Sequence, residues 1–261
     1  MNSRRRLTNS RFWRNGSAKA FPEIRVTAKP LANKIALVTG ASRGIGAATA
    51  LALGKAGAHV ILTARTAGGL EEIEEAIDAA GGSATIAPMD LTENESISRL
   101  ASAVTERWNA LDMLVLNAAT LGTLSATGAI DFKEFAKVLT LNVTAQAALL
   151  AAFDPALRKA SEARVIGLTS SVGRIPRAYW GSYGASKAAF ENLLLSYGEE
   201  VRHITGIRTA LVDPGATRTK MRARAYPGEN PESVKAPEVV AERIVALMTA
   251  GFETGHFERV E

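Results

Sequence analysis

The chain has 261 residues, enough for one large α/β domain or two small ones with a buried core. It contains no cysteine, which excludes disulfides and thiolate metal sites, and its three histidines lack ligand spacing, so we predict no metal site. The net charge of +5 is concentrated in residues 1–30, which carry eight Lys/Arg and one acid.

We predict that residues 1–30 are a basic, disordered extension and that residues 31–261 are the folded domain. A nucleic-acid-binding arm and a transit-type presequence are the alternatives for this Arg-rich, acid-poor segment. The sequence has no run of eighteen apolar residues, so we expect no membrane span. We therefore expect a cytoplasmic protein without nucleic-acid or membrane partners.

From residue 34 onward, short apolar runs alternate with helical stretches. Runs that are apolar on both faces are typical of buried parallel strands. The predicted strands are 34–40, 59–65, 84–90, 112–118, 163–169 and 207–215, with 255–261 as a short edge strand.

Several predicted helices have start or stop signals. Gly81 and Gly82 end a helix, and Pro237 suits the first position of the last one. The pairs Thr92–Glu95 and Asp131–Glu134 fit N-terminal capping. The regular alternation predicts a doubly wound, Rossmann-type parallel sheet of seven strands in a single domain, with helices on both faces. Ligands bind such sheets at the carboxyl ends of the strands.

The first predicted strand leads into "TGASRGIG", Thr39 to Gly46. Gly40 permits a tight turn, and Gly44 and Gly46 let a pyrophosphate approach the backbone at a helix N-terminus. Helix–strand packing alone is the alternative explanation of these glycines. The turn predicts nucleotide contacts from Gly40, Ser42, Arg43, Gly44, Ile45 and Gly46.

The end of the second strand indicates which cofactor is bound. An acid at this position usually accepts hydrogen bonds from the ribose of NAD. This chain has Arg65 instead, and Arg43 lies in the glycine turn. Two guanidiniums suit a 2′-phosphate, so we predict NADP(H), with NAD(H) as the alternative cofactor and solvated surface charge as the alternative role.

Two further strand ends suit a dinucleotide. Asp90, followed by Leu91, ends the third strand, where a carboxylate can accept from the adenine amino group. Asn117 and Ala118 end the fourth strand, where small residues leave room for the cofactor ribose.

Taken together, "TGASRGIG", "LNAA", "LNVTA", "TSS" and "YGASK" resemble the motifs of the short-chain dehydrogenase/reductase family over residues 33–257. The family has NNAG where this chain has LNAA. The resemblance implies an NADP-preferring bacterial-type oxidoreductase that transfers hydride between nicotinamide and a ketone or secondary alcohol. It also implies a catalytic tetrad of Asn142, Ser170, Tyr183 and Lys187.

The family assigns a role to each member of this tetrad. The serine lies thirteen residues before the tyrosine, which selects Ser170 and leaves Ser171 as a substitute. Asn142 is expected to hold a water that links the lysine to solvent. Lys187 is expected to bind the nicotinamide ribose as well. Tyr179 lacks a lysine four residues later and is not a candidate.

The spacing of Tyr183 and Lys187 suits proton transfer. Carbonyl reduction creates an alkoxide that needs a proton donor, and residues i and i+4 share one face of a helix. We expect the lysine and the oxidised nicotinamide to lower the phenol pKa from about 10. Ser170 can donate to the substrate oxygen.

The resemblance places the loop after the sixth strand against the nicotinamide, through Pro214, Gly215, Thr217 and Thr219. Segment 218–235 is polar and irregular and suits a lid over the substrate. Its basic residues indicate either an acidic substrate or a solvated lid surface; they are Arg218, Lys220, Arg222 and Arg224. Tyr179 and Trp180 are candidates for the substrate pocket.

Two alternatives come from other classes. One is a non-catalytic NADP(H)-binding regulator or scaffold, which has no need of a proton donor. The other is a methyltransferase-like protein with another adenosine cofactor, which has no use for Tyr183 and Lys187. The family resemblance further implies a homodimer or homotetramer that packs through the helices of Asn142 and Tyr183.

Overall fold

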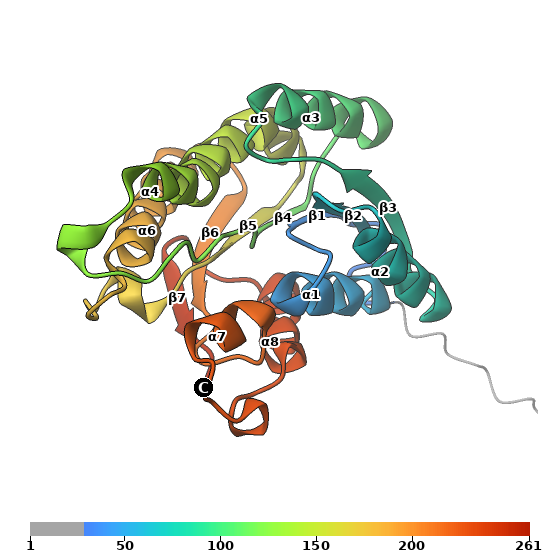
Figure 1. Cartoon of the computed structure of the whole chain (residues 1–261). Coiled ribbons are helices and arrows are strands. Elements are labelled where there is room, and N and C mark those ends of the chain that lie inside the picture. Colours follow the sequence, from blue (N-terminus) through green and yellow to red (C-terminus); the bar gives the residue numbers. More distant parts are fainter. Residues whose placement is uncertain (1–28) are drawn as a thin grey trace, which may run out of the picture.

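A seven-stranded parallel sheet forms the middle layer of the structure, a computed structural model that describes residues 29–261 (Figure 1). The strand order is β3-β2-β1-β4-β5-β6-β7, as the sequence predicts for a doubly wound fold. The predictions for residues 1–28 lie outside the described residues. The strands are β1 Ile35–Thr39, β2 His59–Ala64, β3 Ser83–Pro88, β4 Met113–Leu116, β5 Ala163–Leu168, β6 Ile207–Asp213 and β7 His256–Arg259.

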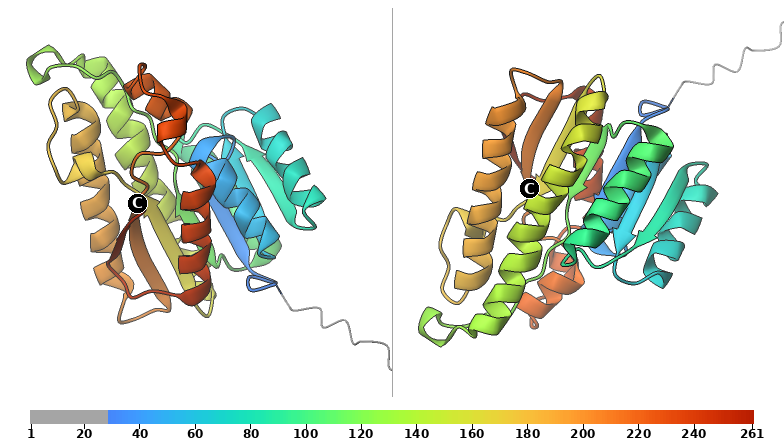
Figure 2. Two further views of the ribbon diagram at one scale, coloured as in Figure 1. Left: turned by 90° about the horizontal axis from the view of Figure 1, so that it is seen from below. Right: turned by 90° about the horizontal axis from the view of Figure 1, so that it is seen from above.

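Helices cover both faces of the sheet, and the two views in Figure 2 show one face each. The α-helices are α1 Gly44–Lys55, α2 Gly68–Ala79, α3 Asn94–Trp108, α4 Phe132–Leu139, α5 Ala145–Lys159, α6 Gly181–Val201, α7 Lys220–Ala225 and α8 Pro237–Ala250. The short turns are η1 Thr127–Ala129, the π-helical η2 Thr140–Thr144, η3 Ser171–Gly173 and η4 Pro231–Ser233.

Two hydrophobic clusters hold these layers together. Val38 and Val115 face the cluster under α1, α2 and α8, whereas their neighbours Leu37 and Leu114 face the cluster under α3, α5 and α6. Successive strand residues point to opposite faces, so a strand buried on both sides must be apolar throughout. This requirement explains the continuous apolar runs of the sequence.

The helix ends follow the sequence signals with one exception. Asp131 caps α4 by accepting from the backbone N–H groups of Lys133 and Glu134, and Pro237 opens α8. The predicted cap at Thr92 is wrong, because α3 begins only at Asn94. The Thr92 hydroxyl donates instead to Asp90 Oδ1 at 2.8 Å, which keeps this residue in the turn after β3.

Among the described residues, the helical run Phe132–Lys159 is long and apolar enough to cross a membrane by length and composition. Its Leu149 and Phe153 are fully buried against the sheet. A core helix of this kind meets the same criteria, so the run is weak support for a membrane span.

A glycine sets the distance between β5 and α6. A Cβ on Gly167 would lie 2.6 Å from both Leu194 and Phe190 of α6. Only glycine lets the helix approach this closely, and α6 carries Tyr183 and Lys187.

We expect Gly167→Val to lower the free energy of unfolding by about 1–3 kcal/mol, because the added methyl groups overlap two buried side chains. Urea-induced unfolding measures the change. Gly128→Ala is the matched control, since nothing lies within 4 Å of a Cβ there, and it should change stability by less than about 0.5 kcal/mol. Equal stability of the two variants would contradict the close approach of α6.

Candidate active site

The predicted site residues lie at one edge of the sheet. Because neighbouring strands are all parallel, the turns after β1 to β6 emerge at the same carboxyl edge. The strand order reverses between β1 and β4, so the glycine turn after β1 lies beside Asn117 after β4. Open α/β sheets bind ligands at such a reversal.

The glycine turn has the conformation that a bound dinucleotide requires. Gly40 and Gly44 have φ angles of +67° and +59°, and a Cβ on Gly46 would lie 2.3 Å from the Gly40 carbonyl oxygen. The N-cap residue of α1, Arg43, makes no side-chain cap, and the first turn of α1 contains no acid. Ser42 and Ile45 are partly buried in the same turn. The open amides of α1 fit a pyrophosphate, so the residues present fit the predicted cofactor.

Asn117 fastens the glycine turn to β4. Its Nδ2 donates to the Thr39 carbonyl at 2.8 Å and to the Gly40 carbonyl at 3.3 Å. The backbone N–H groups of Asn117 and Ala118 donate to Thr39 Oγ1 at 2.9 and 3.0 Å. Besides the predicted place near the ribose, Asn117 therefore has a structural role.

Arg43 and Arg65 are both exposed at this edge. Within residues 29–261, neither guanidinium forms a hydrogen bond or an ion pair. The Arg65 charge does act on the nearby Asp90 carboxylate. Both guanidiniums are thus available to an anionic ligand.

Asp90 is held in a fixed orientation after β3. The Thr92 backbone N–H donates to its Oδ1 at 2.9 Å, and the Thr92 hydroxyl donates to the same oxygen. These bonds, the backbone bond first, lower the pKa of Asp90, and the Arg65 guanidinium adds to the effect. The next residue, Leu91, is buried in the core. This arrangement keeps an ionised carboxylate at the carboxyl edge of the sheet, where the predicted contact with the adenine amino group needs a hydrogen-bond acceptor.

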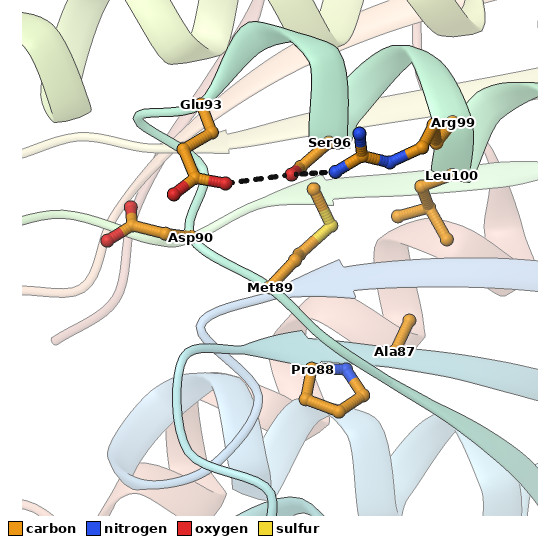
Figure 3. Close-up of a pocket in the computed structure, with 8 residues that line it drawn as sticks. All are labelled: Ala87, Pro88, Met89, Asp90, Glu93, Ser96, Arg99 and Leu100. Carbon is orange, nitrogen blue, oxygen red and sulfur yellow. Dashed lines mark hydrogen bonds between the residues drawn. The ribbon is translucent and has the colours of Figure 1, made fainter.

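A cavity of about 320 Å³ adjoins Asp90 between the end of β3 and α3 (Figure 3). Its polar wall is a chain in which Arg99 donates to Ser96 Oγ at 2.8 Å and Ser96 donates to Glu93 at 3.0 Å. The cavity lies at an outer strand, away from Tyr183, which follows β5. It is lined by Ala87, Pro88, Met89, Asp90, Glu93, Ser96, Arg99 and Leu100.

Tyr183 and Lys187 share one face of α6 beside the end of β5. Tyr183 is 7% exposed and Lys187 is 4% exposed. Lys187 Nζ donates to the Leu168 carbonyl at 2.7 Å and stands 5.8 Å from the centre of the Tyr183 ring. Tyr183 lies in a third, smaller apolar cluster with Leu121 and Val172, apart from the two main cores.

Burial dominates the titration of this pair. It raises the pKa of Tyr183, and the Asp213 carboxylate adds to this effect. Burial also lowers the pKa of Lys187 to about 8, against the opposing influence of Glu191. In the chain without cofactor the phenol pKa thus shifts upward, whereas the lowering expected from the sequence is the joint effect of Lys187 and the oxidised nicotinamide. The apolar surroundings of the ring favour the neutral phenol.

Ser170 begins the short loop between β5 and α6. It has extended backbone, is partly buried, and its carbonyl accepts from the Gly173 N–H at 2.9 Å. Ser171, the substitute, is the first residue of η3 and is also partly buried. Ser170 lies two residues beyond Leu168, the residue that holds Lys187. The chain thus brings the serine and the lysine to the same strand end.

Asn142 is fully buried in the π-helical turn between α4 and α5. Its Nδ2 donates to the Thr120 carbonyl at 2.9 Å and to Ser186 Oγ at 3.0 Å, and its Oδ1 accepts from the Thr120 N–H at 2.8 Å. Ser186 precedes Lys187 on α6. Asn142 therefore joins the turn after β4 to the helix of the tyrosine and lysine. The π turn is a feature that the sequence analysis missed.

The loop after β6 closes over the glycine turn. Gly215 has a φ angle of +60°, and the Thr217 hydroxyl donates to the Pro214 carbonyl at 2.9 Å. Thr219 caps α7, and a Cβ on Gly44 would lie 3.4 Å from its methyl group. Residues predicted to touch the cofactor from separate segments are therefore neighbours.

Helix α7 and the residues before α6 cover Tyr183 with apolar surface. The Trp180 ring meets the Tyr183 ring edge-on at 6.0 Å and the Tyr226 ring at 5.9 Å. Tyr179 is exposed, with a left-handed φ of +71°. The partly buried apolar residues packed on this cluster are Leu124, Trp180, Met221 and Ala225.

Two of the four basic residues of the predicted lid are occupied by protein partners. Arg222 forms a two-pronged pair with Glu229, and Arg224 donates to the Gly122 carbonyl at 2.9 Å. Arg218 and Lys220 are exposed. Glu191, a buried carboxylate one turn beyond Lys187, was not predictable from the sequence, because its partners come from distant segments.

Known proteins resemble this chain in sequence and in fold. An uncharacterised oxidoreductase of Escherichia coli (strain K12), YciK, is 33% identical over 221 residues, covering 84% of this chain and 87% of the relative. A short chain dehydrogenase from Salmonella enterica has a TM-score of 0.86 at 32% identity, covering 90% of this chain and 98% of the other.

A third similar protein, from Shigella flexneri, was solved as a complex with NADP. Its TM-score is 0.85 at 32% identity, with coverage of 89% of this chain and 99% of the other. A family model described as short chain dehydrogenase matches residues 34–230. With this match and the parallel seven-stranded fold, the chain belongs to the short-chain dehydrogenase/reductase family of oxidoreductases.

Proposed function

We propose that this protein is an NADP(H)-dependent oxidoreductase that interconverts a ketone and a secondary alcohol, with Tyr183 as the general acid and base. The observation that carries this proposal is the anchoring of Lys187 to the strand end that leads to Ser170, one helical turn from Tyr183. Asn142 completes the proposed catalytic group.

NADP(H), when bound, supplies or accepts the hydride. The Tyr183 phenol, which is neutral at pH 7, donates its proton to the substrate oxygen during reduction. Ser170 donates a hydrogen bond to the same oxygen and orients it. The Lys187 ammonium stabilises the phenolate that remains after proton transfer.

The cofactor assignment rests on charge at the carboxyl edge. Arg43 and Arg65 are exposed and without hydrogen-bond or ion-pair partners among the described residues, and they would hold the 2′-phosphate. NADP in the Shigella flexneri relative supports this choice, and NAD(H) stays the alternative. The pyrophosphate would lie on the amides of the glycine turn. Asp90 with Leu91 would contact the adenine, and Asn117, Ala118 and the β6 loop would face the ribose and nicotinamide.

The cover over Tyr183 favours an uncharged, apolar carbonyl substrate. Leu121, Val172, Trp180 and Met221 supply hydrocarbon and aromatic surface around the phenol. The guanidinium of Arg222 is neutralised by Glu229, so it offers little to a substrate carboxylate. A solvated lid surface therefore explains the basic residues of this segment better than an acidic substrate does.

Other classes account less well for these features. A regulator that only binds NADP(H), or a methyltransferase, gains nothing from a buried lysine beside a buried phenol. We also propose a homodimer or homotetramer and a cytoplasmic location, on the family resemblance alone. Oligomeric mass in solution tests the first proposal.

We expect purified protein to oxidise NADPH with neutral aromatic or aliphatic ketones and aldehydes, at higher kcat/KM than with carboxylate-bearing analogues. Loss of nicotinamide absorbance gives the rate. Tyr183→Phe should lower kcat by about 10²- to 10⁴-fold, because it removes the proton donor, while NADPH still binds. The matched control, Tyr197→Phe, removes a phenol hydroxyl of the same helix that donates to Asp154, and it should keep the rate. Full turnover by Tyr183→Phe would refute the assignment.

We expect Arg65→Asp to weaken NADPH binding at least tenfold relative to NADH binding, because it replaces a charge-assisted donor with a repelling carboxylate. Nicotinamide fluorescence titrations with both cofactors measure the ratio. Arg107→Asp makes the same charge change on the exposed end of α3 and should leave the ratio unchanged. An unaltered ratio in Arg65→Asp would exclude this side chain from the 2′-phosphate.

We expect kcat/KM for carbonyl reduction to stay level up to about pH 8 and to fall above it. The pKa of Lys187 is lowered to about 8, so its cationic form is present below that pH and is lost above it. The phenol does not limit this range, because its pKa is raised. Rates between pH 6 and pH 10 give the profile. A level profile up to pH 10 would contradict the role of the ammonium.

A further inference from the structure

Glu191 is a buried carboxylate on α6, one helical turn beyond Lys187 and two beyond Tyr183. It is 6% exposed. Its Oε1 accepts a hydrogen bond from the Thr169 hydroxyl, and its Oε2 accepts one from Arg174 Nε at 2.6 Å. Both oxygens of one carboxylate are therefore engaged, each by a different residue.

These two partners lie on either side of the loop that carries Ser170. Thr169 immediately precedes the serine, and Arg174 immediately follows η3. The loop also packs closely on α6: a Cβ on Gly173 would lie 3.2 Å from Lys187 Cβ, and one on Gly184 would lie 2.8 Å from the Val172 carbonyl oxygen. Any sliding of the loop along the helix would break these contacts.

Arg174 adds a third element to this arrangement. Its guanidinium stacks over the Phe257 ring of β7 at 3.6 Å from the ring centre. Arg174 itself is 40% exposed at the side chain, whereas the Glu191 side chain is 8% exposed. The carboxylate thus lies at the centre of contacts that join the ends of β5 and β7 to α6.

We infer that Glu191 is a positioning residue of the active site: its carboxylate fixes both ends of the Ser170 loop to the helix that carries Tyr183 and Lys187. The inference rests on the proposed function, because that function assigns catalytic roles to Ser170 and Lys187. Burial of a carboxylate is costly unless it is paired, and a hydrophobic residue often fills such a place at no loss of stability. The presence of a paired carboxylate at this buried place agrees with a role in placing the serine.

The charge of Glu191 also acts on the lysine. It opposes the effect of burial and raises the pKa of Lys187 toward its usual range. Two other charged groups lie near these residues. Arg174, from the loop after β5, pairs with Glu191, and Asp213 on β6 acts on Tyr183. From the remaining elements, η2 presents the neutral Asn142 and β7 the uncharged Phe257. Glu191 therefore helps to keep Lys187 cationic.

Glu191→Gln tests both effects, since it keeps the shape and removes the charge. We expect the alkaline limb of kcat/KM for carbonyl reduction to move about one unit toward lower pH, because the ammonium loses its anionic neighbour. We expect kcat to fall about tenfold or more, with the dissociation constant of NADPH unchanged. The matched control is Glu199→Gln on the same helix, whose exposed carboxylate pairs with Arg202, and it should change neither quantity.

Thr169→Val separates position from charge. It removes one hydrogen bond of the loop and keeps the carboxylate. We expect kcat to fall, while the midpoint of the alkaline limb of kcat/KM stays within about 0.2 pH units of the wild-type value. A general loss of stability would not lower kcat and leave this midpoint in place. Wild-type kcat in both Thr169→Val and Glu191→Gln would overturn the positioning role, whether or not the variants melt at lower temperature.

The pKa of Lys187 can also be measured without turnover, and this measurement does not depend on the proposed function. The Cε signal of Lys187, assigned by its absence in Lys187→Met, is titrated by ¹³C NMR in the wild type and in Glu191→Gln. A lower midpoint in the variant supports the inference, and equal midpoints refute the electrostatic effect. If the wild type reduces no carbonyl compound with either nicotinamide cofactor, the proposed function fails, and the NMR titration still decides the effect of Glu191 on Lys187.

Discussion

The hydrogen bond from Lys187 Nζ to the Leu168 carbonyl is the contact on which the proposed active site depends. It ties the second turn of α6 to the last residue of β5, and therefore fixes the lysine, the tyrosine one turn away and the serine two residues on. The glycine at 167 makes this possible, because the helix lies against the strand with no room for a Cβ. The close packing of α6 on β5 therefore determines where the candidate catalytic residues lie.

Burial is the largest influence on the pKa values of Tyr183 and Lys187. A phenol and an ammonium that are both almost excluded from water each favour their neutral forms, so the tyrosine keeps its proton and the lysine holds its own less firmly. The Asp213 carboxylate on β6 opposes proton loss from Tyr183, and the Glu191 carboxylate on α6 opposes proton loss from Lys187. The resulting state suits a proton donor that acts next to a cation.

Local sequence signals predicted most of the fold and much of the candidate site. The apolar strands, the glycine turn, the Asp131 cap and the spacing of Tyr183 and Lys187 are all set by neighbours along the chain. The π turn at Asn142 was not predictable, because its partners Thr120 and Ser186 come from other segments. The Thr92 cap is lost to a local bond with Asp90, two residues away, which the capping pattern alone does not reveal. The burial that raises the Tyr183 pKa does depend on other segments.

Part of the wall over Tyr183 comes from other segments of the chain than the groups beneath it. Leu121 and Leu124 follow β4, and Met221 and Ala225 belong to α7, whereas the serine, tyrosine and lysine lie between β5 and the middle of α6. Replacement of the first set need not disturb the second. Substitutions after β4 and in α7 can therefore alter which substrates fit beside Tyr183, while the positions of the serine, tyrosine and lysine stay the same.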